Sequence, residues 1–291
     1  MSSATPSHLV RLTGRTVIKV SGPDRIKLLQ GLITADLTTL SPETPALWSA
    51  ILTPQGRWQA DFFVIQDPDE TYLLLDCAAT QAEDLKKQLS RFKLRSDVQL
   101  ELTGLTVCAA WGSRPAADIA ENAIVFADPR RAEAGWRLID TPPETAETAT
   151  ESDYNLHRLV LGLPDGVQDC EQGRTLAAEA NMDLLGALSW TKGCYMGQEV
   201  TARMHYRTLL KRRLVPVAAT HPLPAPGTPV FAGEAEVGTM RSSQDHIGLA
   251  LLKVSALEHP LTCDGITLTP RPTEWLKPAI DALSSSENSQ P

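Results

Sequence analysis

The stretch ALWSAILTPQGRWQADFFVIQDPDETYLLLDCAA, residues 46–79, contains three apolar runs separated by two short turns. Residues 54–56, Pro-Gln-Gly, form the first turn, and residues 67–70, Asp-Pro-Asp-Glu, form the second. Turns this short connect neighbouring antiparallel strands, whereas parallel strands need a long crossover. The stretch therefore predicts three strands in an antiparallel meander.

The segments on either side of the meander add helices and further strands. Residues 16–37 indicate a strand, a turn and a helix, and residues 80–94 indicate a second helix with apolar positions on one face. Strands are expected at 98–102 and 106–112. Hairpins predominate over crossovers, and neither a GxGxxG nor a Walker phosphate loop occurs. The predicted fold class is therefore α+β and not a doubly wound nucleotide-binding fold.

The second half of the chain differs from the first in composition and in its pattern of apolar residues. The polar, Pro/Thr-rich residues 141–152 indicate an exposed loop, and a helix is expected to begin at about Asp153. The apolar segment LLGALSW, residues 184–190, resembles a buried strand. Residues 214–280 show short β-like runs with many prolines and glycines, which predicts a small C-terminal β-barrel or sandwich. The polar residues 281–291 indicate a disordered tail.

Composition excludes several classes of function. The chain has 291 residues and a net charge of −8, which argues against direct binding of nucleic acid. It contains no apolar run of about 18 residues, and its N-terminal residues do not resemble a secretory signal, so no membrane association and a cytoplasmic location are expected. The five cysteines lie far apart with no CxxC, so no stably bound metal is expected.

The most chemically crowded stretch is TKGCYMGQEVTAR, residues 191–203. A helix is expected from about Gly197, so Cys194 would lie just before a helix N-terminus and two residues after Lys192. Both features favour a thiolate over a thiol. In the alternative interpretation, Gly193 and Gly197 are turn residues and Cys194 is a small buried hydrophobe.

Two other groups allow two interpretations each. The cations of residues 203–213 could converge on an anionic ligand or form a solvated basic face; they are Arg203, Arg207, Lys211, Arg212 and Arg213. Asp61 lies in a predicted strand and is flanked by the aromatic residues Trp58 and Phe62, so it could be a buried acid with an altered pKa. Strand alternation favours instead an Asp61 that faces solvent while Phe62 packs inward.

The segment KGCYMGQE, residues 192–199, matches the K-G-C-[FY]-x-G-Q-E motif of the YgfZ family. Members of this family are folate-binding proteins related to the aminomethyltransferase of the glycine cleavage system. GLPDG at 162–166 and EANMD at 179–183 are also similar to family segments, and the resemblance extends over nearly the whole chain. It is strongest to the branch that contains the mitochondrial iron–sulfur assembly factor and its bacterial counterparts.

The resemblance implies a fold and an activity. Residues 1–213 would form a folate-binding region of two interleaved α+β subdomains, arranged with the C-terminal barrel around a central channel. The protein would bind tetrahydrofolate or a derivative and assist the assembly or repair of 4Fe–4S proteins, with assembly proteins or client enzymes as partners. The related transferases carry two adjacent aspartates where this chain has Ala60 and Asp61, and Arg-Leu-Glu where it has residues 158–160, Arg-Leu-Val. An assembly factor is therefore expected rather than a classical enzyme.

The expected site combines these observations. Cys194 and Lys192 are expected to carry the chemistry, with no metal ligands. The residues expected to bind folate or to shape its site are Asp61, Glu179, Asn181, Gly193, Tyr195, Gly197, Gln198, Glu199 and Arg203. Two alternative functions remain open: a tetrahydrofolate-dependent one-carbon transferase with Asp61 as its acid or base, and an accessory protein for tRNA modification.

Overall fold

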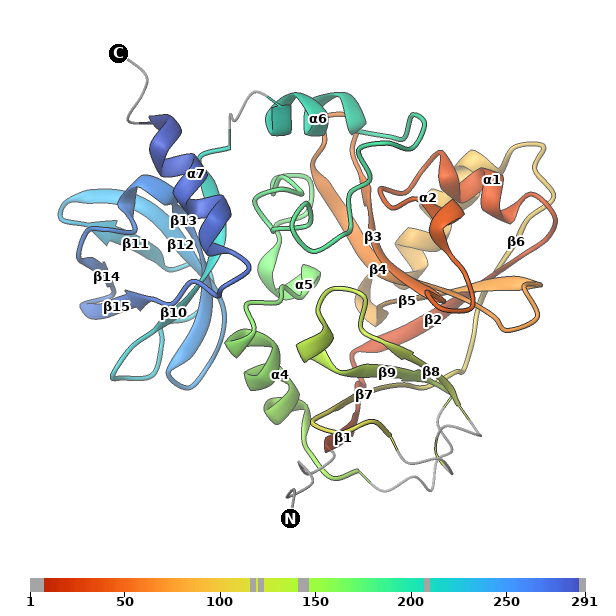
Figure 1. Ribbon diagram of the computed structural model, residues 1–291, viewed down its shortest axis with the longest axis horizontal. Coiled ribbons are helices and arrows are strands. Elements are labelled where there is room, and N and C mark those ends of the chain that lie inside the picture. The colour runs from red at the N-terminus through yellow and green to blue at the C-terminus, as the bar shows by residue number, and fades with distance from the viewer. Residues whose placement is uncertain (1–7, 116–118, 120–122, 141–146, 207–209, 288–291) are drawn as a thin grey trace. The chain divides into compact units, whose positions relative to one another are not determined.

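The computed structural model describes residues 8–115, 119, 123–140, 147–206 and 210–287. The chain divides into two compact units (Figure 1). The first unit comprises Met1–Thr53, Gln59–Tyr154 and Leu185–Met196, and the second comprises Pro54–Trp58, Asn155–Leu184 and Gly197–Pro291. Each unit is therefore assembled from segments that are far apart in the sequence.

The first unit contains a five-stranded sheet with the order β3-β4-β5-β2-β6. Its strands are β2 (Arg15–Ser21), β3 (Ala46–Leu52), β4 (Trp58–Gln66), β5 (Tyr72–Ala78) and β6 (Gln99–Leu102). Consecutive order along β3, β4 and β5 confirms the predicted meander. The register pairs Val64 with Leu75, and Leu75 with Ile18 on the other side.

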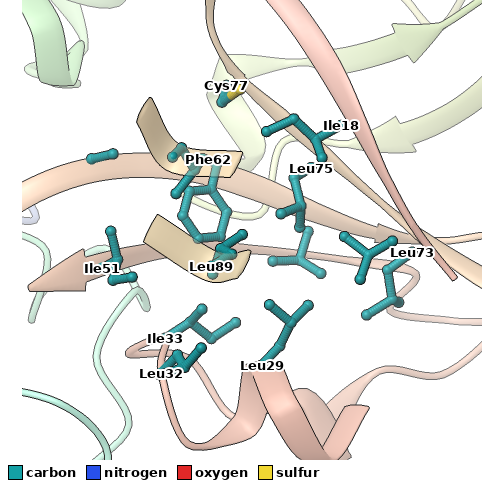
Figure 2. Close-up of a cluster of buried hydrophobic side chains, with 14 of the residues drawn as sticks. Ile18, Leu29, Leu32, Ile33, Ile51, Phe62, Leu73, Leu75, Cys77 and Leu89 are labelled. Carbon is teal, nitrogen blue, oxygen red and sulfur yellow. The ribbon is translucent and has the colours of Figure 1, made fainter. Parts of the chain in front are cut away.

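One face of this sheet is covered by helices α1 (Arg25–Gln30) and α2 (Ala82–Lys93). Figure 2 shows Phe62 and Leu75 of the sheet pointing towards Leu29 and Leu89 of the helices. These side chains are almost completely buried. Burial of an apolar side chain of this size contributes about 1.5–3 kcal/mol, so this cluster is a major source of stability for the unit.

A second antiparallel sheet in the same unit has the order β1-β7-β9-β8. Its strands are β1 (His8–Arg11), β7 (Val107–Trp111), β8 (Ile124–Ala127) and β9 (Trp136–Ile139). Every residue of β7 is buried. The first unit is thus α+β, as the hairpin pattern predicts.

The second unit contains helices α4 (Glu151–Val160), α5 (Gly166–Asp169) and α6 (Gln198–Tyr206), although the first residues of α4 belong to the first unit. A closed barrel follows, with the order β10-β13-β12-β11-β14-β15 (Figure 1, blue). Its strands are β10 (Arg212–Ala218), β11 (Pro229–Ala232), β12 (Ala235–Gln244), β13 (Ile247–Lys253), β14 (Leu261–Cys263) and β15 (Ile266–Pro270). The predicted C-terminal barrel is confirmed, and its first strand begins two residues earlier than expected.

Two segments differ from the sequence expectations. Helix α7 (Lys277–Glu287) includes residues 281–287, which we expected to be disordered, because Ile280 and Leu283 are buried in the apolar cluster of the barrel. Residues 288–291 of the expected tail and 141–146 of the expected loop lie outside the described residues. The segment 184–190 forms turns and irregular structure instead of a strand. In the part of the chain that the structure describes, no helix combines the length and the apolar character that crossing a membrane requires.

Candidate functional site

The cysteine of the KGCYMGQE segment lies at the protein surface. Cys194 is exposed, whereas Cys77, Cys108, Cys170 and Cys263 are buried. Burial raises the pKa of the Cys77 thiol to about 12 and that of Cys263 to about 11, so these thiols are inert at neutral pH. The interpretation of Cys194 as a small buried hydrophobe is therefore wrong, and it is the thiol of this chain that a partner can reach.

Lys192 anchors the loop that carries Cys194. Its side chain is buried, and Nζ donates hydrogen bonds to the carbonyl oxygens of Ile33 at 2.9 Å and Ala35 at 2.6 Å. The ammonium group also lies 5.3 Å from the centre of the Tyr195 ring, within the range of a cation–π interaction. The partners of this ammonium are main-chain carbonyls that follow α1, so its observed role is to hold the loop in place.

Burial gives Lys192 a pH-dependent effect on stability. Its pKa is lowered from 10.5 to about 8, although the nearby Asp36 carboxylate raises it. The unfolded chain keeps the ordinary pKa, so between pH 8 and 10.5 the unfolded state binds more protons than the folded state. We expect the stability advantage of the wild-type chain over Lys192→Met to rise with pH across this window, measured by urea denaturation at several pH values. An advantage that is flat or falls with pH would contradict this assignment.

The structure constrains the residues around Cys194 to different degrees. Gly193 is exposed, its φ is not in the left-handed region, and a Cβ there would meet nothing within 4 Å. The backbone of the loop therefore does not itself require glycine at this position. Gly197 has φ +83° and does require it. Tyr195 is buried, which raises its pKa to about 12, and its hydroxyl has no hydrogen-bond partner among the described residues.

Helix α6 begins at Gln198, directly after Gly197, as the sequence predicts. Glu199 and Arg203 form an ion pair of 2.9 Å one turn apart, and both side chains are largely exposed. Exposed pairs of this kind contribute only about 0.3–0.5 kcal/mol. These two residues are thus available at the surface, while Arg207 lies outside the described residues.

Asp61 is buried, contrary to the prediction that it faces solvent. Its carboxylate accepts a hydrogen bond of 3.0 Å from Nε1 of Trp48 on the neighbouring strand β3. Strand alternation does place Asp61 and Phe62 on opposite faces, but both faces of β4 are covered. The prediction failed because it assumed that the face opposite the helices is open to water.

The same face of the sheet contains a buried network of charges that the sequence analysis missed. Asp76 is fully buried and accepts from Nε of Arg15 at 2.7 Å and from Nε of Arg137 at 3.1 Å. The Arg137 guanidinium lies 4.0 Å from the centre of the Phe63 ring, and its Nη1 has no hydrogen-bond partner among the described residues. One sequence feature could have revealed this network: a single charged residue inside an otherwise apolar strand. Asp76 has this position in YLLLDCA, and Arg137 has it in WRLI.

Glu179 and Asn181 hold the segment 176–184 against strand β10. The Glu179 carboxylate accepts from Nε of Arg212 at 2.9 Å and from the Leu176 amide at 3.0 Å. Asn181, with φ +59°, donates from Nδ2 to the Leu214 carbonyl at 2.8 Å. Both side chains are thus used in tertiary contacts within the second unit, and the ligand binding implied by the resemblance stays a prediction for them.

The cations at residues 211–213 do not share one environment. Arg213 is buried and pairs with Asp183 at 2.9 Å, whereas Arg212 pairs with Glu179. Lys211 is exposed. The aspartate and glutamate partners come from the preceding segment 176–184, and the sequence alone does not reveal these pairings.

Comparison with known proteins first identifies the fold of the chain. Residues 211–278 match the model of the CAF17 C-terminal β-barrel domain. The chain is similar in structure to the glycine cleavage system aminomethyltransferase T from Bartonella henselae, with a TM-score of 0.78 and 14% identity over 94% of this chain and 87% of that one. The chain therefore has an aminomethyltransferase-like fold with a CAF17-type C-terminal barrel.

Sequence comparison identifies the family more narrowly. The chain is 36% identical to the mitochondrial iron–sulfur cluster assembly factor IBA57 of Homo sapiens, over 86% of this chain and 79% of the human protein. It is 34% identical to the Mus musculus protein of the same name, with the same coverage. The chain belongs to the IBA57 family.

The relatives also correct one expectation. We expected a cytoplasmic location, but the related proteins of Homo sapiens, Mus musculus and Mycosarcoma maydis are all named as mitochondrial. The expectation depended on N-terminal residues that do not resemble a secretory signal. Mitochondrial leaders are amphipathic and lack a continuous apolar block, so that argument discriminates poorly between the two compartments.

Proposed function

We propose that this chain is a folate-binding accessory protein that assists the assembly or repair of 4Fe–4S proteins through its cysteine loop. The IBA57 relatives are named as iron–sulfur cluster assembly factors, which favours an assembly factor over a classical enzyme. The observation that carries the mechanism is the exposed thiol of Cys194 on a loop anchored by the buried Lys192. The partners are assembly proteins or the client enzymes that receive a cluster.

A single accessible thiol limits what the loop can do. In the described part of the chain, no three His, Cys, Asp or Glu side chains gather into a group that could hold a metal ion. A 4Fe–4S cluster is usually held by four cysteine thiolates, so one thiol can contact a cluster or a partner cysteine only in a transient complex. The cluster is then a substrate in transit, and the partner supplies the remaining ligands.

The neighbours of Cys194 support a partner-facing role. The two hydrogen bonds of Lys192 hold the backbone before Cys194, which limits the conformational entropy lost when a partner binds. The open space around Gly193 lets a partner approach the backbone next to the thiol. Both features favour close contact between this loop and a second protein.

The folate part of the proposal depends on the far face of the five-stranded sheet. A pterin needs hydrogen-bond donors and acceptors beside an aromatic surface. Asp61 supplies a buried carboxylate, Nη1 of Arg137 is a buried donor without a partner among the described residues, and Trp48 and Phe63 supply aromatic rings. These side chains are of the kinds that a pterin requires, which supports placing the folate at this face. When bound, tetrahydrofolate supplies a carrier for one-carbon units and an oxidisable reduced pterin.

Titration with tetrahydrofolate, followed by tryptophan fluorescence and by calorimetry, tests this assignment. We expect saturable binding with quenching of Trp48, because this side chain donates to Asp61. Asp61→Asn should weaken binding by about tenfold or more, since it removes a charged hydrogen-bond acceptor. Asp69→Asn, in an exposed turn, is the matched control and should bind as the wild type does.

The outcomes separate the two parts of the proposal. Absence of binding by both methods would reject the folate site and leave the assembly role of Cys194 to its own test. Turnover of an aminomethyl donor in the same titration would favour the one-carbon transferase alternative.

A further inference from the structure

A cavity of about 400 Å³ in the second unit is lined mainly by charged side chains. Six of its lining residues carry the argument: Arg57, Arg174, Arg212, Arg241, Glu171 and Glu179. Four guanidinium groups face two carboxylates, which leaves a net charge of +2 around the cavity in a chain whose net charge is −8. The volume falls within the range of about 300–1,000 Å³ typical of small-ligand sites.

The backbone around the cavity is well defined. Arg57 lies in the turn between β3 and β4, and it pairs as an isolated bridge with Leu176. The Trp58 amide donates to the Thr175 carbonyl at 2.8 Å, and the Gly173 amide donates to the Trp58 carbonyl at 2.8 Å. Arg57 also donates from Nη1 to the carbonyl of Arg174. The turn and the segment 171–176 thus form one wall.

The carboxylates occupy only part of the donor capacity of the arginines. Glu171 accepts from Nη1 of Arg241 at 2.7 Å, and only at 3.5 Å from Nη1 of Arg174. Arg241 is 8% exposed, and its Nε has no hydrogen-bond partner among the described residues. The side chains of Arg174 and Arg212 are 82% and 46% exposed, so they can reorient towards a ligand at the mouth.

We propose that this cavity binds a small ligand with two or more carboxylate or phosphate groups. Arginine recognises both groups through parallel hydrogen bonds, and two negative charges would neutralise the excess around the cavity. Arg241 provides the deep contact, while Arg174 and Arg212 close over the ligand from the mouth. Glu179, one of the residues that the family resemblance assigns to folate, lines this cavity and holds Arg212. The site uses neither Cys194 nor the far face of the five-stranded sheet, where folate binding is proposed, so it goes beyond the proposed function and does not depend on it.

Calorimetric titration of the full chain with citrate and, separately, with inorganic pyrophosphate tests the site. Sodium chloride at matched ionic strength corrects for general screening. We expect saturable binding of at least one probe, and the tighter probe identifies the carboxylate or the phosphate as the natural group. Arg174→Gln and Arg212→Gln should each weaken binding by about tenfold, the loss expected for one charged hydrogen-bonding partner.

Two further variants make the result decisive. Arg271→Gln removes an exposed arginine of the same unit that does not line the cavity, and it should change the affinity by less than about twofold. Arg241→Gln should abolish binding; if this variant does not fold, the exposed Arg174 decides the question. The proposal is overturned if neither probe binds saturably, or if Arg174→Gln and Arg212→Gln bind as tightly as the wild type.

Discussion

Cells that carry Cys194→Ser as their only copy of this chain are expected to lose the activity of their 4Fe–4S enzymes under oxidative stress, to the level of cells without the chain. The substitution replaces a soft metal ligand and nucleophile with a hydroxyl that has neither property at neutral pH. Because Cys194 is exposed, the free energy of unfolding should change by no more than about 0.5 kcal/mol. The measurement is the activity of several 4Fe–4S enzymes in extracts, together with the abundance of the variant.

The neighbouring Thr191→Ala, also at an exposed position, is the matched control and should retain full activity. Thiol labelling of the native protein gives an independent check. One thiol per chain should react rapidly with a maleimide before denaturation and five after it, and Cys194→Ser should remove the rapid reaction. Full enzyme activity in the Cys194→Ser cells would refute the proposed role of the loop.

Asp76→Asn should reduce the free energy of unfolding by about 3–5 kcal/mol, the largest loss of stability that we expect from a single substitution. Asp76 is fully buried between Arg15 and Arg137, so removal of its charge leaves the buried Arg137 and the partly buried Arg15 without their common anion. Urea denaturation of the purified variant measures the effect.

Asp69→Asn, in the exposed turn before β5, serves as the control and should stay within about 0.5 kcal/mol of the wild type. A double variant, Asp76→Leu with Arg137→Met, should recover part of the loss, because it replaces a charged pair with apolar side chains. A loss below about 1 kcal/mol in Asp76→Asn would show that this network contributes little to the unit. Since the network orients Arg137, Asp76→Asn should also weaken tetrahydrofolate binding.

Local patterns predicted much of the fold. Short turns at 54–56 and 67–70 favour antiparallel neighbours, and the structure has β3, β4 and β5 in that order. The apolar spacing of 80–94 predicts α2, because side chains three and four residues apart share one face of a helix. The start of α6 after Gly197 follows from the conformational freedom of glycine at a helix boundary.

Contacts between distant segments decided what those patterns could not. Lys192 lies two residues before Cys194, and this proximity suggested a partnership with the thiol. Its ammonium binds instead the carbonyls of Ile33 and Ala35, more than 150 residues earlier in the chain. Asp61 points to the sheet face opposite the helices, as strand alternation predicts. That face is also covered by other parts of the chain, so Asp61 is buried. Residues 281–287 are polar in composition, yet Leu283 packs into the barrel cluster and the helix continues.

The amino-acid order alone was enough to specify the α+β class, the meander, the C-terminal barrel and the family motif around Cys194. These features depend on the periodicity of neighbouring residues and on turn chemistry, which act over a few positions. The exposure of Cys194, the anchoring of Lys192 and the pairing of Asp76 with two arginines depended on the tertiary structure. Burial and ion pairing are properties of side chains that meet only when the chain folds, so no local pattern encodes them.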